Sequence, residues 1–251
     1  SEAAAALKGR IKSAMTYPIS VLTIAVGVVI IIMVKVIPVF SQMYEGLGAK
    51  LPYATIICMQ ISNIIINYSY VLVAFCVVAW LGIRQYYRTN QGRLVLDRLL
   101  LKTPVLGDLI LKVSVARFCR TLGTLTSSGV PILEGMDITA RTSGNMVIQN
   151  AILTAKTAVE QGRNISTPMA ETKVFPPMVV QMVGVGEATG ALDAMLSKVA
   201  DFYEDEVDNA VASLTSLMEP LMIAVLGVII GFIVIAMYMP IFQLANVFGK
   251  D

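Results

Sequence analysis

The chain has 251 residues, of which 56% are hydrophobic and 14% charged, with a formal net charge of +2. Ordinary soluble domains carry roughly 25% charged residues, so this composition excludes a typical soluble domain and indicates a membrane protein. Charged residues are absent from three windows of 22, 33 and 30 residues, which lie between Lys12 and Lys35, between Lys50 and Arg84, and between Glu219 and Lys250. About 20 helical residues cross a hydrocarbon core, so each window predicts one membrane span.

The first and third windows carry the same proline frame at an offset of 202 residues. Pro18 and Pro38 bracket the first window, and Pro220 and Pro240 bracket the third. An internal repeat indicates a repeated structural unit, so we expect the two spans to be equivalent exits from equivalent domains. On this interpretation, most of a homologous domain is missing upstream of Ser1. A secretory signal peptide would not explain this second copy of the frame.

The prolines also predict where the spans begin and end. At Pro18 and at Pro220, which follows Glu219, proline can occupy the opening turn of a helix, where its missing N–H is not needed. Pro38 and Pro240 lie near the far ends, where a helix can stop or kink. Lys35 lies about one turn before Pro38, and we interpret it as an anchor that reaches the membrane interface.

The positions of Lys and Arg predict the orientation. Basic residues precede the first span and follow the second, while the connection between them contains only Lys50. The positive-inside rule places the basic flanks in the cytoplasm. Within the connection, Gly48 and Pro52 predict a turn, followed by a helix over 55–67 that leads into the second span. The predicted organisation is a tail of a first, mostly missing cytoplasmic domain (1–16), a membrane helix (17–40), an extracytoplasmic connection (41–63), a second membrane helix (64–83), a second cytoplasmic helical domain (84–218), a third membrane helix (219–242) and an extracytoplasmic tail (243–251).

The segment 84–218 is long enough for one compact domain, and its pattern predicts an antiparallel helical bundle. Helix breaks are expected at Pro104 with Gly107, at Gly129 to Pro131, at Gly144, at Gly162, and at Pro176 with Pro177. From Leu192 onward, apolar residues recur at helical spacing opposite an acidic face, so this helix is expected to continue into the third span. The predicted fold class is therefore an all-α polytopic membrane protein with three transmembrane helices.

Charge is unevenly distributed in this domain. Eight basic residues and two acidic ones lie between Arg84 and Arg120, whereas eight acidic residues and one lysine lie between Glu187 and Glu219. Either a basic segment beside lipid head groups with a solvated acidic helix, or electrostatic docking to a protein, explains this asymmetry. Both explanations stay open and can hold together.

Residues that would support catalysis are scarce. Histidine, the usual general base and commonest metal ligand, is absent. The three cysteines have no metal-binding or disulfide spacing, and adjacent acids at 204–206 fan apart on a helix. We therefore predict no catalytic, cofactor-binding or metal site, and no enzymatic activity.

Several motifs together resemble the inner-membrane platform proteins of type IV pilus and type II secretion systems, the PilC and GspF family. The resemblance covers nearly the whole chain and rests on Tyr17–Pro18, Leu51–Pro52, Arg117–Phe118, Ser128 to Pro131, Phe175 to Pro177, Gly186 to Gly190, Leu192–Asp193, Glu219–Pro220 and Pro240 to Phe242. One departure is Ala188–Thr189, where the family usually has an acidic or polar residue followed by serine.

This resemblance implies a non-enzymatic, multi-pass platform in the bacterial inner membrane. Such a platform couples a cytoplasmic hexameric ATPase to the assembly of pilin subunits into a type IV pilus. The implied partners are the assembly ATPase, with a retraction ATPase as a further candidate, pilin subunits, other inner-membrane assembly proteins and the lipid bilayer. A homo-oligomer is expected, and contact with nucleic acid is not. The equivalent platform of a type II secretion or DNA-uptake pseudopilus is the alternative, and a transporter or channel is the alternative outside the family.

Two sets of residues are singled out by the signature. Arg117, Arg120, Glu187 and Asp193 are candidate charge partners within the fold, and we hypothesise that some of them face the motor or a second subunit. The structural signature, expected to set helix turns and close packing, comprises Pro18, Pro38, Gly129, Pro131, Pro176, Gly186, Gly190, Glu219, Pro220 and Pro240.

Overall fold

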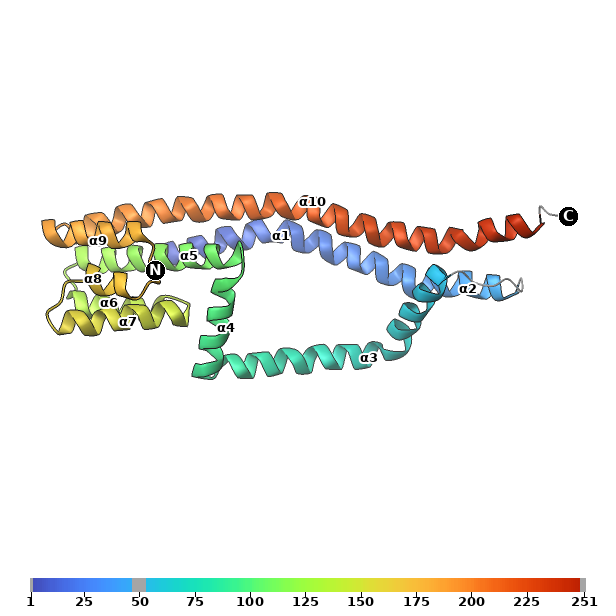
Figure 1. The fold of residues 1–251 in the computed structure, drawn as a ribbon, viewed down its shortest axis with the longest axis horizontal. Helices are drawn as coiled ribbons and strands as arrows, with labels where there is room; N and C mark the ends of the chain where they lie inside the picture. Colours follow the sequence, from blue (N-terminus) through green and yellow to red (C-terminus); the bar gives the residue numbers. More distant parts are fainter. Residues whose placement is uncertain (1, 47–52, 249–251) are drawn as a thin grey trace. The chain divides into compact units, whose positions relative to one another are not determined.

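The computed structural model of the protein describes residues 2–46 and 53–248, and within these ranges it contains helices and no strand. The all-α prediction is confirmed. The helices are α1 (Glu2–Ile31), the π-helix η1 (Ile32–Val36), α2 (Ile37–Gly46), α3 (Tyr53–Tyr87), α4 (Asn90–Lys102), α5 (Leu106–Ser127), α6 (Ile132–Thr142), α7 (Met146–Glu160), α8 (Ser166–Glu171), α9 (Pro177–Thr189) and α10 (Leu192–Phe248) (Figure 1). The turn expected at Gly48 and Pro52 lies outside the described residues.

Three helical stretches are long and apolar enough to cross a membrane, as the uncharged windows predict. They are Lys12–Met43, Tyr53–Tyr87 and Leu192–Met239. Most of their large apolar side chains are exposed at the protein surface, where only a lipid environment would shield them from water. The helix predicted over 55–67 is present as the first part of α3, which bends at Tyr68 before it continues toward Tyr87.

The prediction that helices begin at Pro18 and Pro220 was wrong. Helix α1 begins at Glu2 and continues through Pro18, and α10 begins at Leu192 and continues through Pro220. The residues before each proline are good helix formers or belong to an amphipathic helix, so the helix is already established when it reaches the proline. The expectation that the acidic helix from Leu192 runs unbroken into the third span is confirmed.

The chain forms two compact units. Among the described residues, one comprises 2–14 and 84–214, and the other comprises 15–46, 53–83 and 215–248. We call them the helical-domain unit and the membrane unit, respectively.

In the membrane unit, a small buried cluster joins residues from three helical segments. Met33, Ile37, Cys58, Ile233 and Ala236 form its core. Two buried hydroxyl groups on α3 add hydrogen bonds to backbone carbonyls: Thr55 Oγ1 donates to Ala236 at 2.5 Å, and Ser62 Oγ donates to Met33 at 2.5 Å.

In each case the helical hydrogen-bond donor for this carbonyl would be the N–H of a residue that is a proline of the repeated frame. In an α-helix the carbonyl of Ala236 would accept from the N–H of residue 240, which is a proline. Around Pro38 the helix widens into η1, where the N–H of Ile37 bonds to Ile32, five residues earlier. In that register the proline leaves the carbonyl of Met33 without a donor. The helices therefore continue through Pro38 and Pro240. Hydroxyl groups of α3 donate to the carbonyls that these prolines leave without a hydrogen-bond donor.

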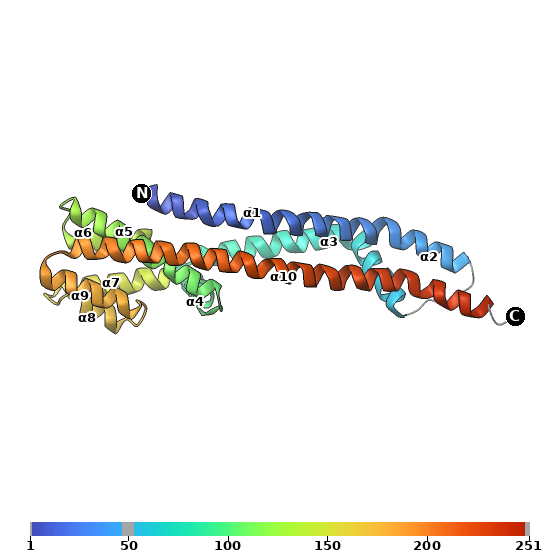
Figure 2. The ribbon, with the colours of Figure 1, turned by 90° about the horizontal axis from the view of Figure 1, so that it is seen from above.

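The helical-domain unit is built around α5. Its core includes Val115, Phe118 and Leu122 of α5, packed with residues of α6, α7, α9 and the first part of α10. Figure 1 shows these helices gathered around α5, and Figure 2 shows α8 beside α9 in the view from above. A second cluster contains Leu109 and Val207.

Glycine closes four of the turns between these helices. Gly129, Gly144, Gly162 and Gly190 all have positive φ between 72° and 84°, a conformation that other residues adopt at a cost. The predicted breaks at Gly129, Gly144 and Gly162 are thus confirmed, and Pro177 opens α9 at its first turn.

Candidate interaction site

Arg120 projects from α5 and forms ion pairs with two acids of α10. Its Nε donates to Glu204 Oε1 at 2.9 Å, its Nη2 pairs with Asp201, and its Nη1 donates to Ser197 Oγ at 3.3 Å. The hydrogen bonds to Glu204 and Asp201 raise the pKa of the guanidinium above its already high ordinary value. Arg120 thus pairs with Asp201 and Glu204 of α10, and these contacts include neither Glu187 nor Asp193, the partners that the sequence suggested.

A groove of about 250 Å³ lies beside this ion pair, between α5 and the start of α10. Its lining brings together two of the four predicted residues, Arg120 and Asp193. The other lining residues are small or polar: Gly123, Thr124, Ser127, Ala194 and Ser197. The close approach of the two helices is possible because Gly123 has no side chain, since a Cβ there would lie 3.2 Å from the Cβ of Leu196.

A second cross-link between α5 and α10 lies at Lys112. Its Nζ lies 2.9 Å from Asp108 and 3.0 Å from Glu206. The hydrogen bonds to Asp108 and Glu206 raise the pKa of the lysine. The basic residues of α5 thus satisfy part of the acidic face of α10 inside the fold.

Glu187 forms hydrogen bonds within the fold, at the start of α8. Its carboxylate accepts the backbone N–H of Ile165 at 2.7 Å and that of Ser166 at 3.4 Å, and it also accepts the Ser166 hydroxyl at 3.4 Å. These are donors at the beginning of α8, which has no side-chain cap of its own. Glu187 therefore holds α8 against α9.

Arg117 is used at the end of α6. Its Nη1 donates to the carbonyl of Thr142 at 3.3 Å, and its guanidinium covers Gly144, where a Cβ would lie 2.8 Å from Nη1. A cation at a helix C-terminus is favourable because it complements the helix dipole. Arg117 and Glu187 do not line the groove that Arg120 and Asp193 line.

Two glycines of the signature, Gly186 and Gly190, are needed for different structural reasons. A Cβ at Gly186 would lie 2.8 Å from the Cα of Leu192 and 3.1 Å from the Cβ of Met195, so α9 and α10 meet closely there. Gly190 closes α9 in the left-handed conformation, and the N–H of Ala191 bonds back to the carbonyl of Gly186.

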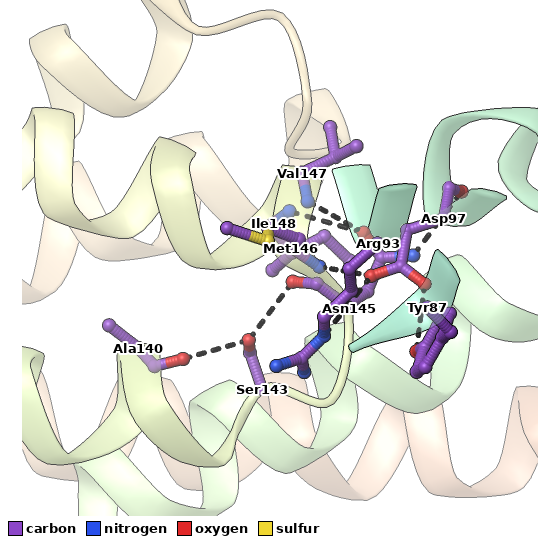
Figure 3. A network of polar contacts seen from close by, with 9 residues as sticks. All are labelled: Tyr87, Arg93, Asp97, Ala140, Ser143, Asn145, Met146, Val147 and Ile148. Carbon is purple, nitrogen blue, oxygen red and sulfur yellow. Dashed lines mark hydrogen bonds and ion pairs between the residues drawn. The ribbon is translucent and has the colours of Figure 1, made fainter. Parts of the chain in front are cut away.

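The sequence analysis missed a buried polar network around Asp97 (Figure 3). The Asp97 side chain accepts the backbone N–H of Met146 at 2.7 Å and the hydroxyl of Tyr87 at 3.1 Å, and Arg93 Nε lies 3.8 Å away. The residue is only 2% exposed. A buried carboxylate requires such partners because its desolvation is costly.

The same network fixes the first turn of α7. Asn145 caps this helix by accepting the N–H groups of Val147 and Ile148, and Ser143 donates to the carbonyl of Ala140 (Figure 3). The available signal was Asp97 itself, a single acid among the leucines and basic residues of 93–102. Sequence alone did not indicate which distant helix it contacts.

Several charged groups of this unit form pairs or helix caps, and no three His, Cys, Asp or Glu side chains gather into a metal-binding group within the described part of the chain. What the site offers chemically is a groove lined by charged, polar and small side chains.

Residues 118–240 match the protein family described as "Type II secretion system (T2SS), protein F". This region includes most of the site and the third apolar stretch, and it belongs to that family of membrane proteins. The resemblance drawn from the motifs is confirmed.

Relatives match nearly the whole chain. It is 48% identical over 240 residues to "Type IV pilus assembly protein PilC" of Myxococcus xanthus, covering 96% of this chain and 58% of the relative. It is 49% identical to the protein of the same name from Thermus thermophilus, covering 95% and 59%. With "Type II secretion system protein F" of Xanthomonas campestris the identity is 34%, covering 99% and 61%. The chain thus spans about three fifths of the length of these relatives.

Proposed function

We propose that this protein is a non-enzymatic platform in the bacterial inner membrane that couples a cytoplasmic hexameric ATPase to the assembly of pilin subunits into a type IV pilus. Three apolar helical stretches support residence in the membrane. The Lys and Arg pattern supports a cytoplasmic location for residues 84–218. Hydrolysis belongs to the ATPase in this proposal, and the present chain transmits its movement.

The observation that carries the proposal is the level of identity to named pilus proteins. Identities of 48% and 49% to pilus assembly proteins exceed the 34% and 29% found with secretion proteins. The type II secretion platform is therefore the second candidate, supported by the description of the matching family. The equivalent platform of a DNA-uptake pseudopilus is a further candidate within the same family.

Within the cytoplasmic part, we assign motor contact to the groove beside Arg120 and Asp193. Glu187 and Arg117 are committed to helix ends, whereas Asp193 lines the groove and Asp201 is 65% exposed at its side chain. An exposed acidic edge next to a paired arginine can guide a basic partner surface and fix its orientation.

The test is site-specific photocrosslinking in cells that assemble pili. A photoreactive residue replaces Ala194, which is exposed in the groove, and a matched one replaces Thr154, which is exposed on α7. We expect Ala194 to crosslink to the assembly ATPase with a yield that changes with nucleotide, and Thr154 to give no such product.

Separate results address the function and the docking site. Loss of pili on deletion of the gene, with restoration by the intact gene, is expected, and normal piliation after deletion would reject the platform function. Absence of any ATPase crosslink at Ala194 in every nucleotide state would reject this docking site only. Asp193→Lys should weaken the crosslink without unfolding the protein, whereas Glu187→Lys should disturb folding.

A further inference from the structure

The outward face of α4 combines apolar and basic side chains. Val95 and Leu99 are 52% and 60% exposed, and Arg98 and Lys102 are exposed beside them. Positions 95, 98, 99 and 102 follow the i, i+3, i+4, i+7 spacing of one helix face. We call these four residues the outer face of α4.

The opposite side of α4 is held in the helical-domain unit. Helix α4 packs against α5 and α7, and the buried Asp97 bonds to the N–H of Met146 at the start of α7. Thr89 caps the helix by accepting the N–H of Gly92. The outer face of α4 is therefore presented in a fixed orientation and cannot rotate inward to hide its apolar side chains.

The chain itself limits how far α4 can be from the end of a helix able to cross a membrane. Helix α3, one of the three stretches able to cross a membrane, ends at Tyr87, and α4 begins at Asn90. The two intervening residues can bridge only about 10 Å when extended. The start of α4 thus lies within that distance of the end of a membrane helix (α3 and α4 are labelled in Figure 1).

The positive charge of the outer face of α4 also indicates the kind of partner that this face binds. Other basic residues of this part of the chain are used internally, because Lys112 and Arg120 pair with acids of α10 and Arg93 lies beside Asp97. Arg98 and Lys102 instead accompany exposed aliphatic side chains. Interfacial helices have this composition: apolar side chains enter the boundary between head groups and acyl chains, and lysine and arginine attract anionic lipids.

We propose that the outer face of α4 is a lipid-binding surface, which seats in the cytoplasmic head-group region and binds anionic phospholipid. It would hold the helical-domain unit at the membrane on the side where α3 ends. This role is independent of any ATPase contact, since it uses different residues from the groove beside Arg120.

The experiment measures lipid contact in the full chain. The exposed Cys76 is replaced by alanine, while Cys58 and Cys119 are fully buried and can stay. Leu99→Cys is labelled with a fluorophore and the protein is reconstituted into nanodiscs containing phosphatidylglycerol and a phospholipid spin-labelled near its head group. Matched labels at Thr154→Cys and at Val185→Cys, an apolar residue 50% exposed on α9, report other surfaces of the same unit.

We expect the spin-labelled lipid to quench the Leu99 label several-fold more than the two control labels. Charge reversal by Arg98→Glu with Lys102→Glu should lower this quenching in phosphatidylglycerol. Lys173→Glu with Lys198→Glu, which changes the net charge equally at exposed positions elsewhere, should leave it unchanged. Circular dichroism of each variant verifies that the helices are intact.

Three results would overturn the inference. Quenching at Leu99 no greater than at Thr154 would show that the face does not meet lipid. Shielding of the Leu99 label from both the spin-labelled lipid and aqueous iodide would indicate that another protein surface covers it. Equal quenching in phosphatidylcholine and phosphatidylglycerol, unaffected by the Arg98 and Lys102 reversal, would remove the anionic selectivity.

Discussion

The hydroxyl of Thr55 donates a 2.5 Å hydrogen bond to the backbone carbonyl of Ala236. That carbonyl lies four residues before Pro240, which has no N–H to offer it. Ser62 and Met33 form the corresponding contact near Pro38. Helix α3 therefore supplies a hydroxyl to each of the two helices that carry the repeated proline frame.

Thr55→Val keeps the shape of this side chain and removes its hydroxyl. We expect it to destabilise the protein by about 1 kcal/mol, because a buried backbone carbonyl loses its donor. The measurement is the midpoint of unfolding of the purified protein in mixed micelles with increasing denaturing detergent, followed by circular dichroism.

The proline supplies the control for this prediction. In a Pro240→Ala background the helix regains an N–H for Ala236, so Thr55→Val should cost clearly less than in the natural sequence. Equal costs in both backgrounds would contradict the idea that Thr55 compensates for the proline.

Gly186→Ala tests the close contact between α9 and α10. The added Cβ would lie 2.8 Å from the backbone Cα of Leu192, so one helix must shift, and we expect a loss of about 1–3 kcal/mol through overpacking. Gly184→Ala on the same helix is the matched control. Its Cβ would meet only Ser166, at 3.4 Å, and the higher helix propensity of alanine should make it neutral or stabilising. Thermal unfolding of both variants gives the comparison, and equal losses would argue against a special contact at Gly186.

Asp97→Ala should be among the most harmful substitutions in α4. It leaves the N–H of Met146 and the hydroxyl of Tyr87 without their acceptor, and we expect a loss of about 2–3 kcal/mol. Asp108→Ala removes an acid that is 60% exposed at its side chain and should cost at most about 1 kcal/mol. If denaturant unfolding gave both variants the same midpoint, the network around Asp97 would not contribute to stability.

The alkaline side of the stability profile should depend on Cys119. Burial raises the pKa of this thiol, an effect only partly opposed by the charge of Arg120. The folded state then retains the proton, while the unfolded state releases it above about pH 8.5. Stability is therefore fully present below that pH and declines above it, by up to about 1.4 kcal/mol per pH unit.

The test compares denaturant midpoints at pH 7.5, 8.5 and 9.5 in a background where Cys58 and Cys76 are alanine. Cys119→Ala should remove most of the decline between pH 8.5 and 9.5, whatever its effect at pH 7.5. An unchanged decline would assign the alkaline sensitivity to other groups.

Local patterns predicted much of the fold. The uncharged windows located the three apolar stretches, and the glycines at 129, 144 and 162 marked turns, because such residues act through the backbone at their own position. The helix starts predicted at Pro18 and Pro220 were wrong, because a helix that is already formed on the N-terminal side of a proline can continue through it. For α10, the apolar spacing from Leu192 onward did predict that continuity.

The sequence by itself determined that this is an all-α membrane protein with the motifs of the type II secretion protein F family, because hydropathy, helical spacing and the motifs around Gly186 are properties of short segments. The tertiary structure alone decided the partners of the charged and polar groups. Arg120 pairs with Glu204, 84 residues away, and Thr55 with Ala236, 181 residues away. Such pairs depend on which helix faces meet, and packing of the whole fold selects those faces.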